Sequence, residues 1–178
     1  MFGGRIFWNA SERFTVSGRI SAWQRRAINV AALRDEARRV DSGFTLASLS
    51  AKIDAGADFF QTQYCFDMDI LRDYMKRIGD FGILERTYFI IGIGPITSAK
   101  SGHWMNKNLF GVHIPESLIN RLEQAEDGKA EGQRICIELL QQLREIEGVS
   151  GAHLMAPQGD QAAADVIRAC GVLEDRVA

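Results

Sequence analysis

Two glutamines, Gln61 and Gln63, lie inside the otherwise apolar segment DFFQTQYCFD, residues 58–67. Aromatic residues, a threonine and a cysteine surround the two amides, which is the composition of a buried strand. A buried amide that lacks hydrogen-bond partners costs about 1–3 kcal/mol. These amides are therefore either satisfied inside a packed core, or at least one of them faces something that is not protein.

Other residue types that often carry chemistry are scattered. The histidines, His103, His113 and His153, occur one to each predicted element, without the spacing of a metal site or a catalytic triad. The cysteines are far apart and contain no Cys-x-x-Cys pair, which argues against a zinc cage or a disulfide framework and favours a reducing compartment. They are Cys65, Cys136 and Cys170. We expect structural roles for both sets, no bound metal and a cytoplasmic location.

The segment GIGPI, residues 92–96, places Gly92 and Gly94 at the end of a predicted strand. A dinucleotide-binding loop requires Gly-x-Gly-x-x-Gly between a strand and a helix. Here Pro95 interrupts the loop, and no third glycine follows at the required position. The alternative, which we favour, is that the small residues let a ligand or a neighbouring backbone approach closely.

The bulk composition is that of an ordinary globular protein. The chain has 178 residues, which predicts one domain, with 46% hydrophobic and 25% charged residues. Its net charge of −2 does not favour nucleic acid or an anionic membrane as a partner. The longest apolar run, near residues 88–96, is about half of a membrane span. The N-terminus lacks the apolar core of a signal peptide.

Hydrophobic periodicity and capping residues predict strands alternating with helices from residue 44 onward. The predicted strands are 58–65, 86–94 and 150–157, and the predicted helices are 46–57, 67–79, 97–111, 114–127, 130–148 and 160–171. Asp67 is the expected N-cap of the second helix and Gly79 its expected end. The arginine-rich residues 1–43 are poorly patterned, with a weak hint of a helix at 22–39.

This alternation predicts a parallel sheet with right-handed crossovers. Two architectures fit, a doubly wound sheet or part of a (β/α)₈ barrel, and both place functional sites at the carboxyl ends of the strands. Those ends are Gln63–Cys65, Gly94–Ile96 and Met155–Pro157. Since side chains alternate along a strand, we expect Gln61 and Gln63 on one face, with Gln61 one step deeper.

Four motifs, in order, resemble the methylenetetrahydrofolate reductase family. They are KIDAGA at 52–57, TQYCFD at 62–67, GIGP at 92–95 and VHIP at 112–115, followed by the late segment GVSGAHLMAP. The resemblance implies a (β/α)₈ barrel that carries FAD. It also implies hydride transfer from NADH or NADPH, through the flavin, to 5,10-methylenetetrahydrofolate, which gives 5-methyltetrahydrofolate. These are steps of one-carbon metabolism and methionine biosynthesis.

The resemblance also implies roles for four residues. Gln63 corresponds to the glutamine that binds the pterin, whose amino-pyrimidinone edge suits an amide. Lys52 corresponds to a lysine that helps to hold FAD, and Ser48 is assigned to the same cofactor. Trp104 is a candidate for an aromatic residue that packs on bound substrate, although the spacing is off by one and Met105 falls nearly as well. The alternative roles are a core amide for Gln63, a solvated helix lysine for Lys52 and helix–barrel packing for Trp104.

The chain also departs from the family pattern. A complete barrel takes about 250 residues, and no counterpart of the early strands, with their acidic residues, is visible. We therefore expect an α/β fold that is a partial (β/α)₈ TIM barrel, comprising the last three strand–helix units plus a divergent N-terminal segment. Residues 1–43 would be a divergent segment, either outside the family or poorly ordered, and residues 44–178 the partial barrel domain.

Three explanations for a truncated chain stay open. It is a disrupted gene, half of a split enzyme, or a reduced relative that binds without catalysing. Because open strand edges and an uncovered face disfavour a monomer, we expect a homo-oligomer or a partner chain that supplies the missing strands. The two functions to be distinguished are a methylenetetrahydrofolate reductase-like oxidoreductase and a non-catalytic folate-binding or assembly module, with an inactive fragment as a third possibility.

Overall fold

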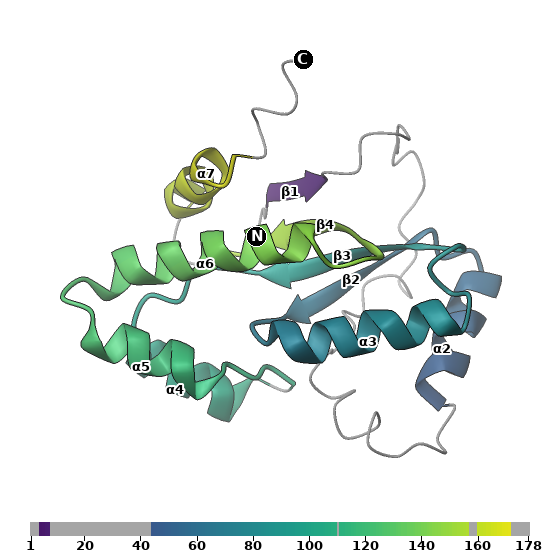
Figure 1. Ribbon diagram of the computed structural model, residues 1–178, viewed down its shortest axis with the longest axis horizontal. Coiled ribbons are helices and arrows are strands. Elements are labelled where there is room, and N and C mark those ends of the chain that lie inside the picture. The colour runs from purple at the N-terminus through teal and green to yellow at the C-terminus, as the bar shows by residue number, and fades with distance from the viewer. Residues whose placement is uncertain (1–3, 8–43, 110, 157–159, 172–178) are drawn as a thin grey trace.

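The computed structural model describes residues 4–7, 44–109, 111–156 and 160–171, with side chains for 49–109, 111–156 and 161–171 (Figure 1). Its strands are β1 (Gly4–Phe7), β2 (Phe59–Tyr64), β3 (Tyr88–Ile93) and β4 (Val149–Leu154). Its helices are α2 (Phe44–Asp54), α3 (Met68–Asp80), α4 (Ala99–Asn108), α5 (Glu116–Gln124), α6 (Gly128–Arg144) and α7 (Asp160–Ala169). The helix suggested at residues 22–39 lies outside the described residues.

The four strands form one sheet in the order β1-β4-β3-β2. β2, β3 and β4 are parallel, as the alternation of strands and helices predicts, whereas β1 pairs antiparallel with β4. The sheet is open in the described residues, so the expected barrel wall is present as an α/β layer without closure. β1 was not predicted, because four residues whose place depends on pairing with a distant strand leave little local pattern.

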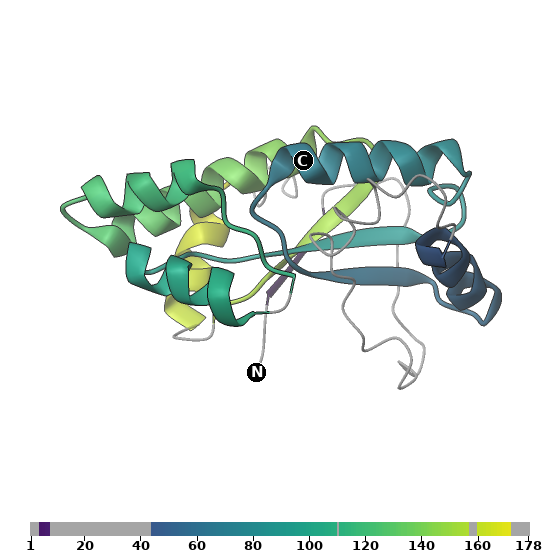
Figure 2. The same ribbon diagram turned by 90° about the horizontal axis from the view of Figure 1, so that it is seen from below.

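Helices α3 and α6 cover one face of this sheet (Figure 2). Phe89, Ile91 and Ile93 point from β3 into the core that these helices complete. Ile90 is buried as well but does not belong to that core, because successive side chains on a strand point to opposite faces. The continuous apolar run of β3 therefore reflects a strand that is covered on both sides.

Capping residues account for most helix boundaries. Asp67 is the N-cap of α3, and its carboxylate accepts a hydrogen bond from the Ile70 amide at 3.1 Å, as predicted. Gly79 does not end that helix: α3 continues to Asp80, and the residue in the left-handed region is Gly82, with φ of 67°. A left-handed backbone after the last turn is a common helix ending, and Gly82 supplies it three residues later.

The first turns of α6 pack directly on the loop that follows β3. A Cβ on Gly132 would lie 1.7 Å from the Ile96 carbonyl oxygen, and one on Gly128 would lie 3.3 Å from that of Thr97. These glycines are four residues apart and so share one side of the helix. The absence of side chains at both positions lets the helix approach the loop backbone, which places the residues after β3.

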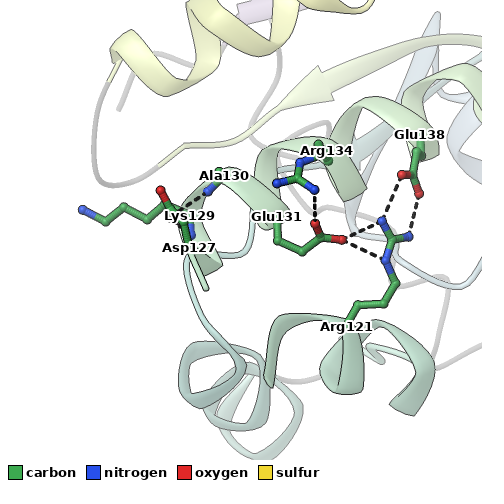
Figure 3. A network of polar contacts seen from close by, with 7 residues as sticks. All are labelled: Arg121, Asp127, Lys129, Ala130, Glu131, Arg134 and Glu138. Atoms are coloured by element: carbon green, nitrogen blue, oxygen red, sulfur yellow. Dashed lines mark hydrogen bonds and ion pairs between the residues drawn. The ribbon is translucent and has the colours of Figure 1, made fainter. Parts of the chain in front are cut away.

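An ion-pair network joins α5 to α6 (Figure 3). The Arg121 guanidinium of α5 donates to Glu138 at 2.6 Å and to Glu131 at 2.7 Å, both on α6. Glu131 is buried and has a second partner in Arg134 at 2.9 Å. Hydrogen bonding from Arg121 lowers the pKa of Glu138, and hydrogen bonding to Glu138 raises that of Arg121. The network links the two helices through their side chains.

This network gives a pH dependence with a defined sign. The folded-state pKa of Glu138 lies below its usual value of 4.5, so its contribution is fully present above that pH and is lost as pH falls through the folded value. We expect Glu138→Gln to lower the free energy of unfolding by about 0.5–1 kcal/mol at pH 7, since the pair is partly exposed. In urea denaturation, the free energies of unfolding of the variant and the parent should converge as the pH falls through the lowered folded-state pKa of Glu138.

The control for this prediction is Glu147→Gln, which neutralises an exposed glutamate outside the network. It should leave the pH dependence of unfolding close to that of the parent. If the free energy of unfolding changes equally with pH in Glu138→Gln and in the parent between pH 3 and 6, the network does not contribute to stability.

Candidate functional site

The carboxyl ends of β2, β3 and β4 meet at one edge of the sheet, where the polar side chains of interest lie. The pairing of β2 with β3 shifts between Gln61 and Tyr64, so that Gln61 lies opposite Ile90 but Tyr64 lies opposite Gly92. The Thr62 hydroxyl accepts a hydrogen bond from the Gly92 amide at 2.8 Å within this irregularity. The regular alternation expected for the two glutamines therefore does not hold beyond Thr62.

Gln63 makes a local hydrogen bond. Its Oε1 accepts from the backbone amide of Tyr64 at 3.1 Å, and the side chain is half-buried. The Nε2 group has no partner among the described residues. Gln63 thus combines both alternatives posed by its sequence: its acceptor is satisfied by backbone, whereas its two donors are available to a ligand.

Gln61 makes a longer-range contact. Its Nε2 hydrogen-bonds the Nδ1 of His153 on β4, across β3. The register places His153 beside Gly92. On the other side of β3, Gln61 lies beside Ile90. The pair was not predicted, since the two residues are 92 positions apart in the sequence.

Tyr64 makes a second connection from β2 to β4. Its hydroxyl donates to the Met155 carbonyl at 3.3 Å, and its ring stacks on Phe66 with centroids 5.6 Å apart. Burial, with a smaller contribution from Cys136, raises the pKa of Tyr64 to about 12. Tyr64 is therefore protonated at neutral pH and acts as a hydrogen-bond donor that ties the strand ends together.

The two glycines of β3 are explained by close approach within the protein. A Cβ on Gly92 would lie 2.6 Å from the Thr62 carbonyl oxygen, and one on Gly94 would lie 2.0 Å from that of Met155. Protein atoms thus occupy the space in front of both glycines. This arrangement supports the interpretation that we favoured over a phosphate-binding loop.

The other predicted site residues lie apart from this edge. Lys52 is half-buried in the last turn of α2, and its carbonyl accepts from Ala57 just before β2. It therefore lies toward the amino end of β2, on the order of 15–20 Å from the strand's carboxyl end. The side chain of Ser48, in the same helix, lies outside the described residues. The structure does not bring Lys52 and Gln63 into one cluster.

Trp104 is on α4, and 56% of its surface is exposed. Asn108 donates to its backbone carbonyl at 2.8 Å. Met105, the alternative, is half-buried and packs against the core. Exposure leaves Trp104 accessible to a ligand, while Met105 already has a structural role.

The remaining titratable candidates have protein partners. The ring of His103 is 3.3 Å from Glu123, and that of His113 is 3.8 Å from Asp67. All three cysteines are buried, and burial raises the pKa of the Cys65 and Cys136 thiols to about 12. Within the described part of the chain, no cluster of these residue types could hold a metal ion, and no helix is long and apolar enough to span a membrane.

Comparison with known proteins was made at the levels of family, sequence and structure. The family described as methylenetetrahydrofolate reductase matches residues 27–171. The motif resemblance starts near residue 44, so the family match begins earlier in the chain than the motifs do. The chain is 28% identical over 134 residues to methylenetetrahydrofolate reductase (NADH) 1 of Arabidopsis thaliana. That alignment covers 73% of this chain and 22% of the plant protein.

A solved structure also resembles the chain. It is an uncharacterized protein from Clostridium thermocellum, described as binding two copies of 5-methyl-5,6,7,8-tetrahydrofolic acid. The TM-score is 0.57 at 18% identity, and the match covers 78% of this chain and 51% of that one. At this identity the likeness shows a shared fold. The chain thus spans about a fifth of the plant relative and half of the clostridial protein.

Proposed function

The chain belongs to the methylenetetrahydrofolate reductase family, and from this membership we propose that it binds a reduced folate at the carboxyl ends of β2, β3 and β4. The observation that carries the proposal is the position of Gln63 within the matched range, at the end of β2, with its Nε2 donors without a described partner. Two N–H donors on one amide can pair with the acceptor atoms of an amino-pyrimidinone edge.

We further propose that the folate is reduced with FAD and a reduced nicotinamide. Bound FAD would supply the hydride-transfer chemistry. NADH is the first nicotinamide to test, because the plant relative is named for it. Lys52 fits a role at the cofactor, because it is a half-buried cation that has no ion pair among the described residues. Its ammonium group could therefore pair with the diphosphate of FAD. Trp104 is an exposed aromatic surface for stacking.

A second candidate function, folate binding without reduction, is favoured by the residue types at the strand ends. Residues 59–66, 88–98 and 149–156 contain no aspartate or glutamate. Asp67, the next carboxylate, already caps α3. Tyr64, with a pKa of about 12, is a weak acid. A carboxylic acid that protonates the folate would therefore come from elsewhere, including another chain that supplies further strands.

One titration series tests both functions. The purified protein is titrated with 5-methyltetrahydrofolate by calorimetry and with FAD by visible absorbance, and NADH is then added without oxygen. A reductase should bind both ligands, and NADH should bleach the flavin absorbance. Folate binding without flavin binding would support the second candidate. A protein that is folded by circular dichroism but binds neither ligand would rule out both.

A further inference from the structure

We propose that the exposed face of α4 formed by Lys100, Trp104 and Lys107 binds the acidic tail of a folate, and that it favours folates with several γ-linked glutamates. These three residues are called the α4 face. The inference rests on the proposed folate-binding function and adds the form of the substrate. It starts from local charge: residues 87–115 contain no aspartate or glutamate, although acidic residues outnumber basic ones, 23 to 21, in the whole chain.

The α4 face is cationic and accessible. Its residues are spaced i, i+4 and i+7, so they lie along one side of the helix. All three side chains are exposed, and neither lysine has an ion-pair partner among the described residues. Glu123 of α5 also approaches α4, but its carboxylate lies 3.3 Å from the ring of His103. Both ammonium groups are therefore available to an anion.

A chain of contacts places α4 beside the carboxyl end of β2. The Asn106 side chain of α4 donates to the Ile114 carbonyl at 3.0 Å and accepts from the Ile114 amide at 2.7 Å. The adjacent His113 ring lies 3.8 Å from the carboxylate of Asp67, which follows β2 by three residues. Figure 1 and Figure 2 both show α4 beyond the carboxyl ends of β2 and β3. A flexible tail that extends from the strand ends thus has α4 as a neighbour.

The chemistry of a folate tail matches this surface. A folate ends in a glutamate, and each further γ-linked glutamate adds one carboxylate and two methylene groups. The carboxylates can pair with the two ammonium groups, and the methylenes can pack on the indole of Trp104. Lys100 and Lys107 are about 10 Å apart along the helix axis. An α-linked residue spans at most about 3.6 Å, and a γ-linkage is two bonds longer, so a tail of three glutamates can contact both lysines.

The experiment is a calorimetric titration at low salt with 5-methyltetrahydrofolate that carries one or three glutamates. Since an exposed ion pair changes affinity by up to about fivefold, we expect the parent to bind the triglutamate about 10-fold more tightly. This ratio should fall to about twofold in Lys100→Gln/Lys107→Gln, and likewise for the parent in 1 M salt, where charges are screened beyond about 3 Å. Lys76→Gln removes an exposed lysine on α3 and should keep the parent's ratio.

The outcomes separate this inference from the proposed function. Equal affinity of the parent for the two folates, or an unchanged ratio in a double variant that unfolds at the parent's temperature, would overturn the inference while the proposed function stands. Free tri-γ-glutamate should bind about 100-fold more weakly than the folate triglutamate, because it lacks the linked pterin. Equal binding of the two would instead make the α4 face a general site for acidic peptides. If the parent binds neither folate, the proposed function itself fails.

Discussion

Replacing Gly132 with alanine is expected to lower the free energy of unfolding by about 2–4 kcal/mol. The new Cβ would lie 1.7 Å from the Ile96 carbonyl oxygen and 2.7 Å from its carbonyl carbon, so helix α6 and the loop after β3 must separate. Overpacking costs typically 1–3 kcal/mol and occasionally more, and a clash with backbone rather than with a flexible side chain belongs above that range, at about 3–5 kcal/mol. It outweighs the gain of about 1 kcal/mol that alanine brings to a helix interior. Thermal unfolding should shift downward by about 6–12 °C.

Gly102→Ala is the matched control. Gly102 is also buried and helical, so alanine brings the same gain in helix propensity there. Its Cβ would clash with the tip of the Ile119 side chain, at 2.5 Å, which can rotate away, and would make ordinary contacts with Ile96 and Ile114 at 3.7 and 3.8 Å. We expect a change within about 1 kcal/mol. Equal unfolding temperatures for the two alanine variants would show that the contact between α6 and the loop backbone is not required for stability.

Gln63→Glu is expected to reduce affinity for 5-methyltetrahydrofolate about 10- to 100-fold with little loss of stability. Glutamate retains the oxygen that accepts from the Tyr64 amide but removes both Nε2 donors. A carboxylate would also face the acceptor atoms of the ligand, which is repulsive and costs more than a missing hydrogen bond. The measurement is calorimetric titration, with thermal unfolding of the same samples.

Gln63→Met separates the two functions of this side chain. It removes the donors and also the acceptor for Tyr64, so it should lose both folate affinity and about 1 kcal/mol of stability. A Gln63→Glu variant that binds the folate as tightly as the parent would exclude Gln63 as the ligand's donor. In that case the proposed site would have to be placed elsewhere on the chain.

Local signals were sufficient to predict the parallel strands and most helices. Asp67 and Ser98 cap α3 and α4 with hydrogen bonds from their own helices, so the information lies within a few residues. The glycines after α2 and α6, Gly56 and Gly148, have φ of 92° and 84°, as helix endings require. Such features are independent of the rest of the fold, and sequence patterns therefore identify them.

The arrangement within the candidate site depends on distant residues and was less predictable. The glutamines of β2 indicated a polar site, but a strand pattern cannot show the shift in register that places Tyr64 opposite Gly92. Nor can it show that Gln61 pairs with His153, because this bond exists only once three strands are aligned. The roles of Lys52, Ser48 and Trp104 remain predictions that ligand titrations with variants at each position can test.

The antiparallel strand β1 restricts how this sheet can be extended. It occupies the backbone hydrogen-bonding edge of β4, which in a closed parallel barrel would be taken by a parallel neighbour. In the described sheet, a strand donated by another molecule can join directly only at β2 or along the outer side of β1. Joining at β4 would first require β1 to detach, so ring closure and the present end strand are mutually exclusive.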